Sequence, residues 1–121
     1  MAYKSTMKKN EKKSRAAPPA AVEEILHLLG HNIRIARLRR KLRLEDLAER
    51  VGVSRFLIAG IEKGKSSTSI GAYVSALWVL GLSDDMSKIA EPDEDFEGKA
   101  LEDIRAPKTA PKRKKVLDND F

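Results

Sequence analysis

The twenty residues 44–63 constrain the fold of this chain more than any other segment. Ala48 and Gly52 stand four positions apart, and Ile58 follows six positions later. Two short helices that cross at a steep angle need a small side chain at their contact, which Ala48 provides. The tight turn between them needs a residue that tolerates φ > 0, as Gly52 does without steric cost. Ser54 is a preferred N-cap for the second helix. The segment therefore predicts a helix-turn-helix.

The remainder of the chain divides into three parts by composition. Residues 1–21 hold six Lys or Arg, one Glu and the run AAPPAA, so we expect a disordered basic arm. Residues 22–90 carry helical apolar spacing and form the expected folded domain. Residues 91–121 turn from acidic through the helix-permissive segment GKALEDIRA to basic and contain Pro107 and Pro111, which predicts a largely extended C-terminal extension.

Within the expected domain, apolar side chains recur at helical spacing. Besides the helix-turn-helix, they predict helices over residues 21–29, 31–41, 70–81 and 83–90. We expect Gly30 to end or offset the first of these, Ser69 to cap the third and Gly81 to close it. The predicted fold class is all-α.

The bulk composition limits the possible partners and compartments. A net charge of +6 and a pI near 9.7 favour a polyanion, although charge alone does not distinguish DNA from RNA or a membrane. The absence of cysteine excludes a disulfide framework and suits a reducing cytoplasm. No apolar run approaches the roughly 18 residues of a membrane span, and the N-terminus lacks the apolar stretch of a signal peptide. We therefore expect a cytoplasmic protein.

Most of residues 28–82 resembles the Cro/cI-type (XRE) family of helix-turn-helix repressors. The motifs that carry the resemblance are, in order, IRIAR, LEDLAERVGVS, IEKG and the capped helix after TS. The resemblance implies a five-helix domain that binds palindromic double-stranded operators as a homodimer. It also implies a buried ion pair between Arg37 and Glu62, which ties the second helix to the end of the recognition helix. A solvated basic face is the alternative for Arg37.

The resemblance further implies which residues meet DNA. The expected contacts are Arg43, Ser54, Arg55, Phe56, Ala59, Gly60, Lys63 and Lys65. On the recognition helix only Arg55 can make a bidentate hydrogen bond, with guanine favoured, and Phe56 can touch a thymine methyl group. Lys63 and Lys65 follow the helix, where family members contact the DNA backbone. Few of these side chains can read base edges directly. We therefore expect DNA shape and the basic arm to provide much of the affinity for DNA.

The chain departs from the family where the first helix of the motif begins. Family members usually place a Thr or Ser cap and then a Gln there, whereas this chain has Arg43 and Leu44. The phosphate contact of the Gln is therefore absent, and Arg43 can replace it electrostatically. For Arg39, Arg40 and Arg43, phosphate contact and simple solvation both remain open.

Residues 80–114 are similar to the C-terminal extension of XRE proteins encoded beside HipA-type kinase toxins. A short helix, a turn with proline and acidic residues, and a Gly–x–Ala–Leu segment carry the similarity. It implies a HipB-like antitoxin that represses its own operon and binds the kinase. Trp78, Phe96 and Leu101 are the expected partner interface, and the alternative for Trp78 is packing against Ile89 or Phe96. The competing functions are a phage-type or chromosomal repressor without a toxin, and an interaction adaptor with vestigial DNA binding.

Neither a metal site nor catalysis is expected. His27 and His31 are four residues apart, with Glu23 and Glu24 one turn earlier, but a site would need further ligands and Gly30 interrupts the predicted helix. Two surface histidines are therefore expected, and a position of His31 near a DNA phosphate remains open. The chain has no cysteine, no glycine loop that cradles phosphates and no plausible Ser/His/Asp set. We expect no enzyme activity and no cofactor.

Overall fold

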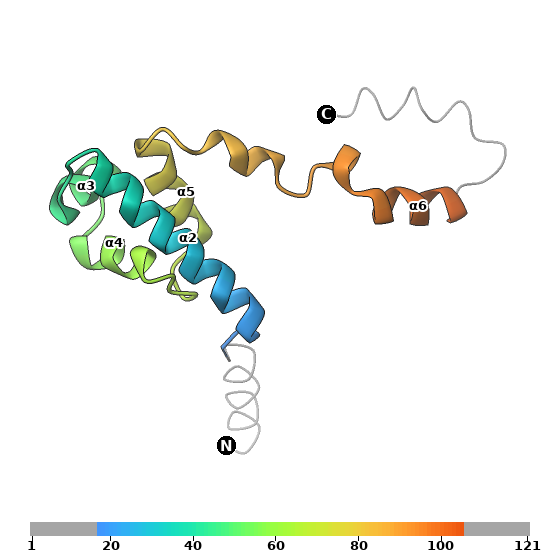
Figure 1. The fold of residues 1–121 in the computed structure, drawn as a ribbon, viewed down its shortest axis with the longest axis horizontal. Helices are drawn as coiled ribbons and strands as arrows, with labels where there is room; N and C mark the ends of the chain where they lie inside the picture. Colours follow the sequence, from blue (N-terminus) through green and yellow to red (C-terminus); the bar gives the residue numbers. More distant parts are fainter. Residues whose placement is uncertain (1–16, 106–121) are drawn as a thin grey trace, which may run out of the picture. The chain divides into compact units, whose positions relative to one another are not determined.

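The computed structural model describes residues 17–105 (Figure 1). Its elements are α2 (Ala20–Arg39), α3 (Leu44–Val51), α4 (Arg55–Glu62), α5 (Ile70–Val79), the 3-10 helices η1 (Asp84–Lys88) and η2 (Pro92–Glu94), and α6 (Phe96–Arg105). These residues contain no strand, so the all-α prediction is confirmed for them. They fall into two compact units, one ending at Asp84 and the other beginning at Asp85. Most of the predicted basic arm lies outside the described residues.

One continuous helix, α2, replaces the two helices predicted over residues 21–29 and 31–41. Gly30 does not end a helix but lies buried in the middle of α2. A Cβ atom on Gly30 would overlap the carbonyl oxygens of Ile61 and Glu62. The glycine therefore allows the backbone of the last turn of α4 to lie directly against α2. The predicted break was wrong because one glycine inside a helix costs only about 1 kcal/mol, which tertiary packing offsets.

Helices α3 and α4 form the predicted helix-turn-helix. Ala48 is 3% exposed at their contact. Gly52 ends α3 with a φ of 88°, and its backbone N–H donates to the Ala48 carbonyl oxygen at 2.8 Å. The Ser54 Oγ atom accepts a hydrogen bond from the Leu57 backbone N–H at 3.2 Å, which caps α4. Each of these predicted residues thus performs a local task that fixes the angle between the helices.

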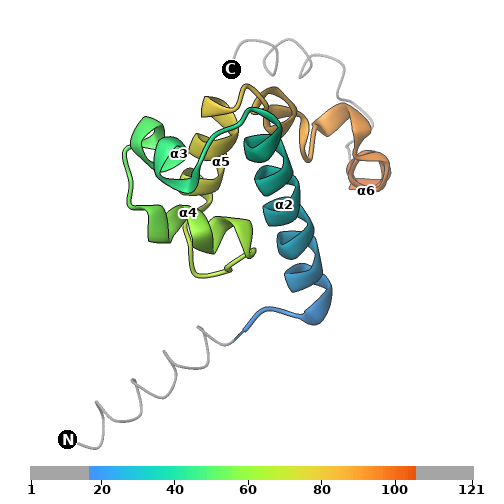
Figure 2. The ribbon, with the colours of Figure 1, turned by 60° about the vertical axis from the view of Figure 1, so that its left-hand side comes forward.

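The first unit has one apolar core enclosed by α2, α3, α4 and α5 (Figure 2). Its largest fully buried side chains are Ile33 in α2, Leu47 in α3, and Ile58 and Ile61 in α4, and Ala76 of α5 is also fully buried. Tyr73 of α5 is 3% exposed and closes the same core. Because α4 packs against the other three helices, its inner side is fixed and its outer side is left exposed.

The C-terminal elements differ in part from their predictions. The Ser69 Oγ atom caps α5 as expected, accepting from the Ala72 N–H at 3.1 Å. The helix predicted over residues 83–90 is only the short 3-10 helix η1. The extension was predicted to be largely extended, but its described part contains the ten-residue helix α6. Asp95 begins that helix, because its Oδ1 atom accepts from the Gly98 N–H at 2.9 Å. A local cap therefore supports α6, in which no residue is buried.

Candidate nucleic-acid interface

The outer face of α4 carries the side chains that the sequence predicts to meet DNA. Arg55 and Phe56 are exposed, with 76% of Phe56 open to solvent. Ala59 and Gly60 are partly exposed on the following turn, and Lys63 is exposed at the C-cap. Helical geometry places residues four apart on one face, so these positions form a single stripe opposite the buried side of α4.

Arg55 and Phe56 form a contact at the start of this stripe. The guanidinium carbon of Arg55 lies 5.4 Å from the centroid of the Phe56 ring, a cation–π arrangement. Among the described residues no carboxylate forms an ion pair with Arg55. The ring thus restricts the Arg55 side chain while leaving its N–H donors available for an acceptor.

A surface cavity of about 620 Å³ lies beside the stripe, and we call it the α2–α4 cleft. Its lining residues are Glu23 and His27 from α2, Phe56, Ala59 and Gly60 from α4, and Lys63, Gly64, Lys65 and Ser66 beyond α4. Five of the eight predicted DNA contacts are therefore brought together around one cleft. Glu23 and His27 join them, although neither is among the residues predicted to contact DNA. Only the continuity of α2 through Gly30 places these two residues beside α4.

Two contacts fix the position of Lys65. Its carbonyl oxygen accepts a hydrogen bond from the buried Tyr73 hydroxyl at 2.8 Å. Burial raises the pKa of that hydroxyl, which keeps its proton in place for donation. The Lys65 backbone N–H also donates to the Gly60 carbonyl oxygen at 3.0 Å. Tyr73 thus positions Lys65. Its helical spacing with other apolar residues predicts only that it belongs to the core.

The ion pair implied by the family resemblance lies behind α4. The Arg37 Nε atom is 2.6 Å from Oε2 of Glu62, and Nη2 donates to Oε1 at 3.0 Å. The two side chains are 7% and 6% exposed. The Nη1 atom of Arg37 also donates to the Leu42 carbonyl oxygen at 2.8 Å. Hydrogen bonding to Glu62 raises the pKa of Arg37, so the pair stays ionised and joins α2, the loop before α3 and the end of α4.

Arg43 stands apart from the α2–α4 cleft, at the N-cap of α3. Its Nε and Nη2 atoms each lie 3.2 Å from an oxygen of the Asp46 carboxylate, and its backbone N–H donates to the same group at 2.8 Å. These bonds lower the pKa of Asp46 and raise that of Arg43. Arg40 donates to the Ala36 carbonyl oxygen at 2.8 Å, which satisfies the end of its own helix. A phosphate would therefore have to compete with existing partners of both arginines.

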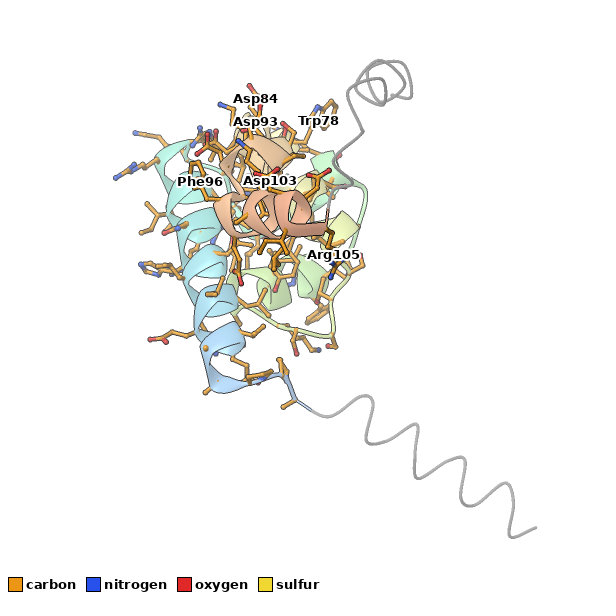
Figure 3. All side chains as sticks on the ribbon, turned by 90° about the vertical axis from the view of Figure 1, so that its right-hand side faces the viewer. Trp78, Asp84, Asp93, Phe96, Asp103 and Arg105 are labelled. Atoms are coloured by element: carbon orange, nitrogen blue, oxygen red, sulfur yellow. The ribbon has the colours of Figure 1, made fainter. Side chains whose placement is uncertain are left out.

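The predicted partner-interface residues are all exposed. Trp78 is 71% exposed on α5 and projects away from the ribbon (Figure 3). In the second unit, Phe96 and Leu101 are 70% and 49% exposed on α6. Trp78 therefore adds nothing to the core of the first unit.

Within residues 17–105 no group of three or more His, Asp or Glu side chains is arranged to hold a metal ion. No helix in the same range has the length and apolar character needed to cross a membrane.

Part of the chain is similar to a known family of domains. A family model described as a helix-turn-helix domain matches residues 28–87. The match begins inside α2, so the eight residues Ala20–His27 that open this helix precede it. The match also ends before α6. No curated protein matches the chain.

Proposed function

We propose that this chain is a sequence-specific, double-stranded DNA-binding repressor that acts as a homodimer, because residues 28–87 match a helix-turn-helix domain and their motifs resemble the Cro/cI family. The observation that carries this proposal is the outer face of α4, where Arg55 and the α2–α4 cleft lie side by side on a helix fixed from behind by the core. In helix-turn-helix proteins the second helix of the motif enters the major groove. Here that helix is α4.

The side chains on this face divide into base and backbone contacts. Arg55 reads guanine through two parallel hydrogen bonds, and Phe56 packs against a neighbouring thymine methyl group. Lys63 and Lys65 neutralise phosphates and set the register of the helix in the groove. One recognition helix per chain reads only a few base pairs, so two copies on a palindrome give a site of useful length. Their half-sites are then separated by about one helical turn, ~34 Å.

Selection from a pool of randomised duplexes tests this proposal with the intact chain. We expect enrichment of a palindrome with a guanine at a fixed position in each half-site, and protection of both half-sites in footprinting. A chain that retains duplexes without enriching any sequence would be a non-specific DNA-binding protein. A chain that binds no duplex would support an interaction adaptor with vestigial DNA binding.

The second part of the proposal is that this repressor is a HipB-like antitoxin, which autoregulates its operon in the cytoplasm and binds a HipA-type kinase. The similarity of residues 80–114 to extensions of such proteins supports it. So do the exposed apolar side chains of the second unit, because an amphipathic helix with an uncovered face is a common form of partner segment. Trp78, exposed on α5, adds an aromatic residue of the kind enriched at interfaces.

Co-expression of the operon and purification of the tagged chain test the antitoxin role. Three forms are compared for kinase capture and operator binding: the intact chain, a chain truncated after Ala90, and Trp78→Ala. We expect both changes to reduce capture and to leave operator binding in place. Undiminished capture by both forms would exclude the proposed surface. If no kinase co-purifies with the intact chain, the plain repressor is the remaining function.

A further inference from the structure

The first two turns of α2 are built into the domain although they precede the helix-turn-helix family match. The His27 Nδ1 atom lies 2.7 Å from the carbonyl oxygen of Lys63, at the C-cap of α4. The backbones of the two segments also touch, since a Cβ atom on Gly64 would lie 2.6 Å from both the Leu26 carbonyl oxygen and the His27 nitrogen. Gly64 itself has a φ of 75°. These turns therefore form a fixed wall of the α2–α4 cleft.

The hydrogen bond of His27 determines which ring nitrogen faces other partners. A carbonyl oxygen only accepts, so Nδ1 carries the proton that is donated to Lys63. In the neutral ring, Nε2 then holds a lone pair and repels an anionic oxygen. When the ring gains a second proton, Nε2 becomes a charged donor. A phosphate beside Nε2 would thus bind only the protonated form.

The charges around the cleft favour an anion. Lys63 and Lys65 line it, and neither forms an ion pair with another described residue. Glu23, one turn before His27, is the acidic group in the lining and opposes them. The cleft also continues into the exposed stripe of α4 through Phe56. A phosphate on the duplex that holds α4 in its groove is therefore the anion within closest reach.

We propose that the α2–α4 cleft binds a phosphate group of the DNA backbone, which Lys63, Lys65 and the protonated ring of His27 hold together. This inference rests on the proposed DNA-binding function and extends the DNA contact to turns of α2 that the family match does not include. Because only the ring with two protons donates from Nε2, phosphate binding in the cleft links DNA affinity to proton uptake by the imidazole. The charged groups facing His27 are Glu23 on its own helix, and Lys63 and Lys65 from the end of α4 and the loop beyond.

The test measures binding of the intact chain to a fluorescein-labelled duplex of mixed sequence between about pH 8 and pH 6. We expect wild-type affinity to rise about fivefold as the pH falls, because the protonated ring offers the phosphate a charged donor at Nε2 where the neutral ring presents a lone pair. His27→Asn keeps a donor near the Nδ1 position but cannot be protonated, so it should lose this rise while keeping its melting temperature. His31→Asn is the matched control, since His31 lies on α2 outside the cleft, and it should keep the rise. A rise that persists in His27→Asn would overturn the proposal.

A second pair of variants probes the same cleft without touching His27. Glu23→Gln removes the carboxylate from the cleft, whereas Glu24→Gln removes the same charge from an exposed residue outside it. We expect Glu23→Gln to tighten duplex binding about threefold at about 0.15 M salt, where distant charges are largely screened, and Glu24→Gln to change it much less. Equal effects would show that only net charge matters and would contradict a phosphate in the cleft.

Titration with inorganic phosphate alone tests whether the cleft binds a phosphate of the DNA backbone or a free anion. At constant ionic strength, we expect it to shift the NMR signals of the His27 ring only weakly and to be displaced by the duplex. Tight phosphate binding that leaves duplex affinity unchanged would assign the cleft to a free anion and overturn the proposal. Failure of the wild-type chain to bind any duplex would instead remove the proposed function on which the inference rests.

Discussion

The two units of this chain place their apolar side chains in opposite ways. Between Ile33 and Leu80 the apolar side chains of α2, α3, α4 and α5 meet in one core, and several of them are completely buried. From Asp85 to Arg105 no residue is buried, and Phe96, Leu101 and Ile104 are 70%, 49% and 79% exposed. The first unit therefore holds its recognition surface ready before a partner arrives. The second has helical form but no core of its own, so covering its apolar face requires another surface.

The units also differ in the charge that they present. Residues 85–105 contain eight acidic and three basic residues, whereas the outer face and C-terminal end of α4 carry Arg55, Lys63 and Lys65, none of which forms an ion pair with another described residue. A duplex attracts the first surface and repels the second. This difference separates a DNA-binding surface from one suited to a protein.

The largest effect should come from the ion pair that the first unit buries. Arg37→Ala leaves the Glu62 carboxylate buried without a partner, and the Leu42 carbonyl loses its donor. We expect the free energy of unfolding to fall by ~3–5 kcal/mol in urea denaturation. Arg34→Ala, at an exposed position on the same helix, should change it by less than about 0.5 kcal/mol. A loss for Arg37→Ala within about 1 kcal/mol would mean that the pair behaves as a surface salt bridge.

The second-largest effect is expected at the outer face of α4 and is measured as a change in affinity for DNA. Arg55→Ala should weaken binding to the selected operator by ~1–3 kcal/mol and relax the preference for guanine at one position of each half-site. Its folding stability should change little, since Arg55 is exposed. Arg50→Ala, exposed on α3, is the control for a lost positive charge. Equal losses on the operator and on random duplexes would make Arg55 a phosphate contact.

The features of the fold that the sequence predicted are those set by near neighbours in the chain. Ala48, Gly52 and Ser54 specify the helix-turn-helix through a contact, a turn and a cap within a few residues. The prediction that Gly30 ends a helix was wrong because the backbone that this glycine contacts, in the last turn of α4, lies about thirty residues further along the chain. A glycine inside good helical spacing can mark either a break or a close approach, and local sequence does not decide between them.

The candidate site shows the same limit. The stripe on α4 followed from helical spacing and the family resemblance, but the cleft exists only because α2 continues past Gly30 and meets Lys63. His27 therefore looked like an isolated surface histidine. Tyr73 looked like a core residue, although its hydroxyl also positions the Lys65 carbonyl. Helix α6 was missed because proline and acidic residues flank it, while the cap by Asp95 is visible only in three dimensions.

A smaller effect is expected from pH at the start of α3. Hydrogen bonds from Arg43 hold the pKa of Asp46 below its ordinary value in the folded chain. A carboxylate with a lowered pKa stabilises the folded state above the ordinary carboxyl range, and this contribution is lost as pH falls through the lowered value. Melting temperatures recorded across the acid range should therefore fall less steeply for Asp46→Asn than for the wild type. Glu49→Gln, exposed on the same helix, is the control and should follow the wild type.

The smallest effect on folding should come from removing the second unit's helix. In a chain truncated after Ala90, the unfolding free energy of the first unit should change by less than about 0.5 kcal/mol, because none of the residues from Glu91 to Arg105 is buried. Two point variants of the full-length chain compare a buried side chain of the first unit with an exposed one of the second. Leu77→Ala, at a side chain 7% exposed in α5, should lose ~2–5 kcal/mol, whereas Phe96→Ala should lose almost nothing. If truncation and Phe96→Ala each lowered stability by more than about 1 kcal/mol, α6 would be part of the folding core. Its apolar face would then be unavailable to a kinase, and the division between a preformed DNA surface and an uncovered protein surface would fail.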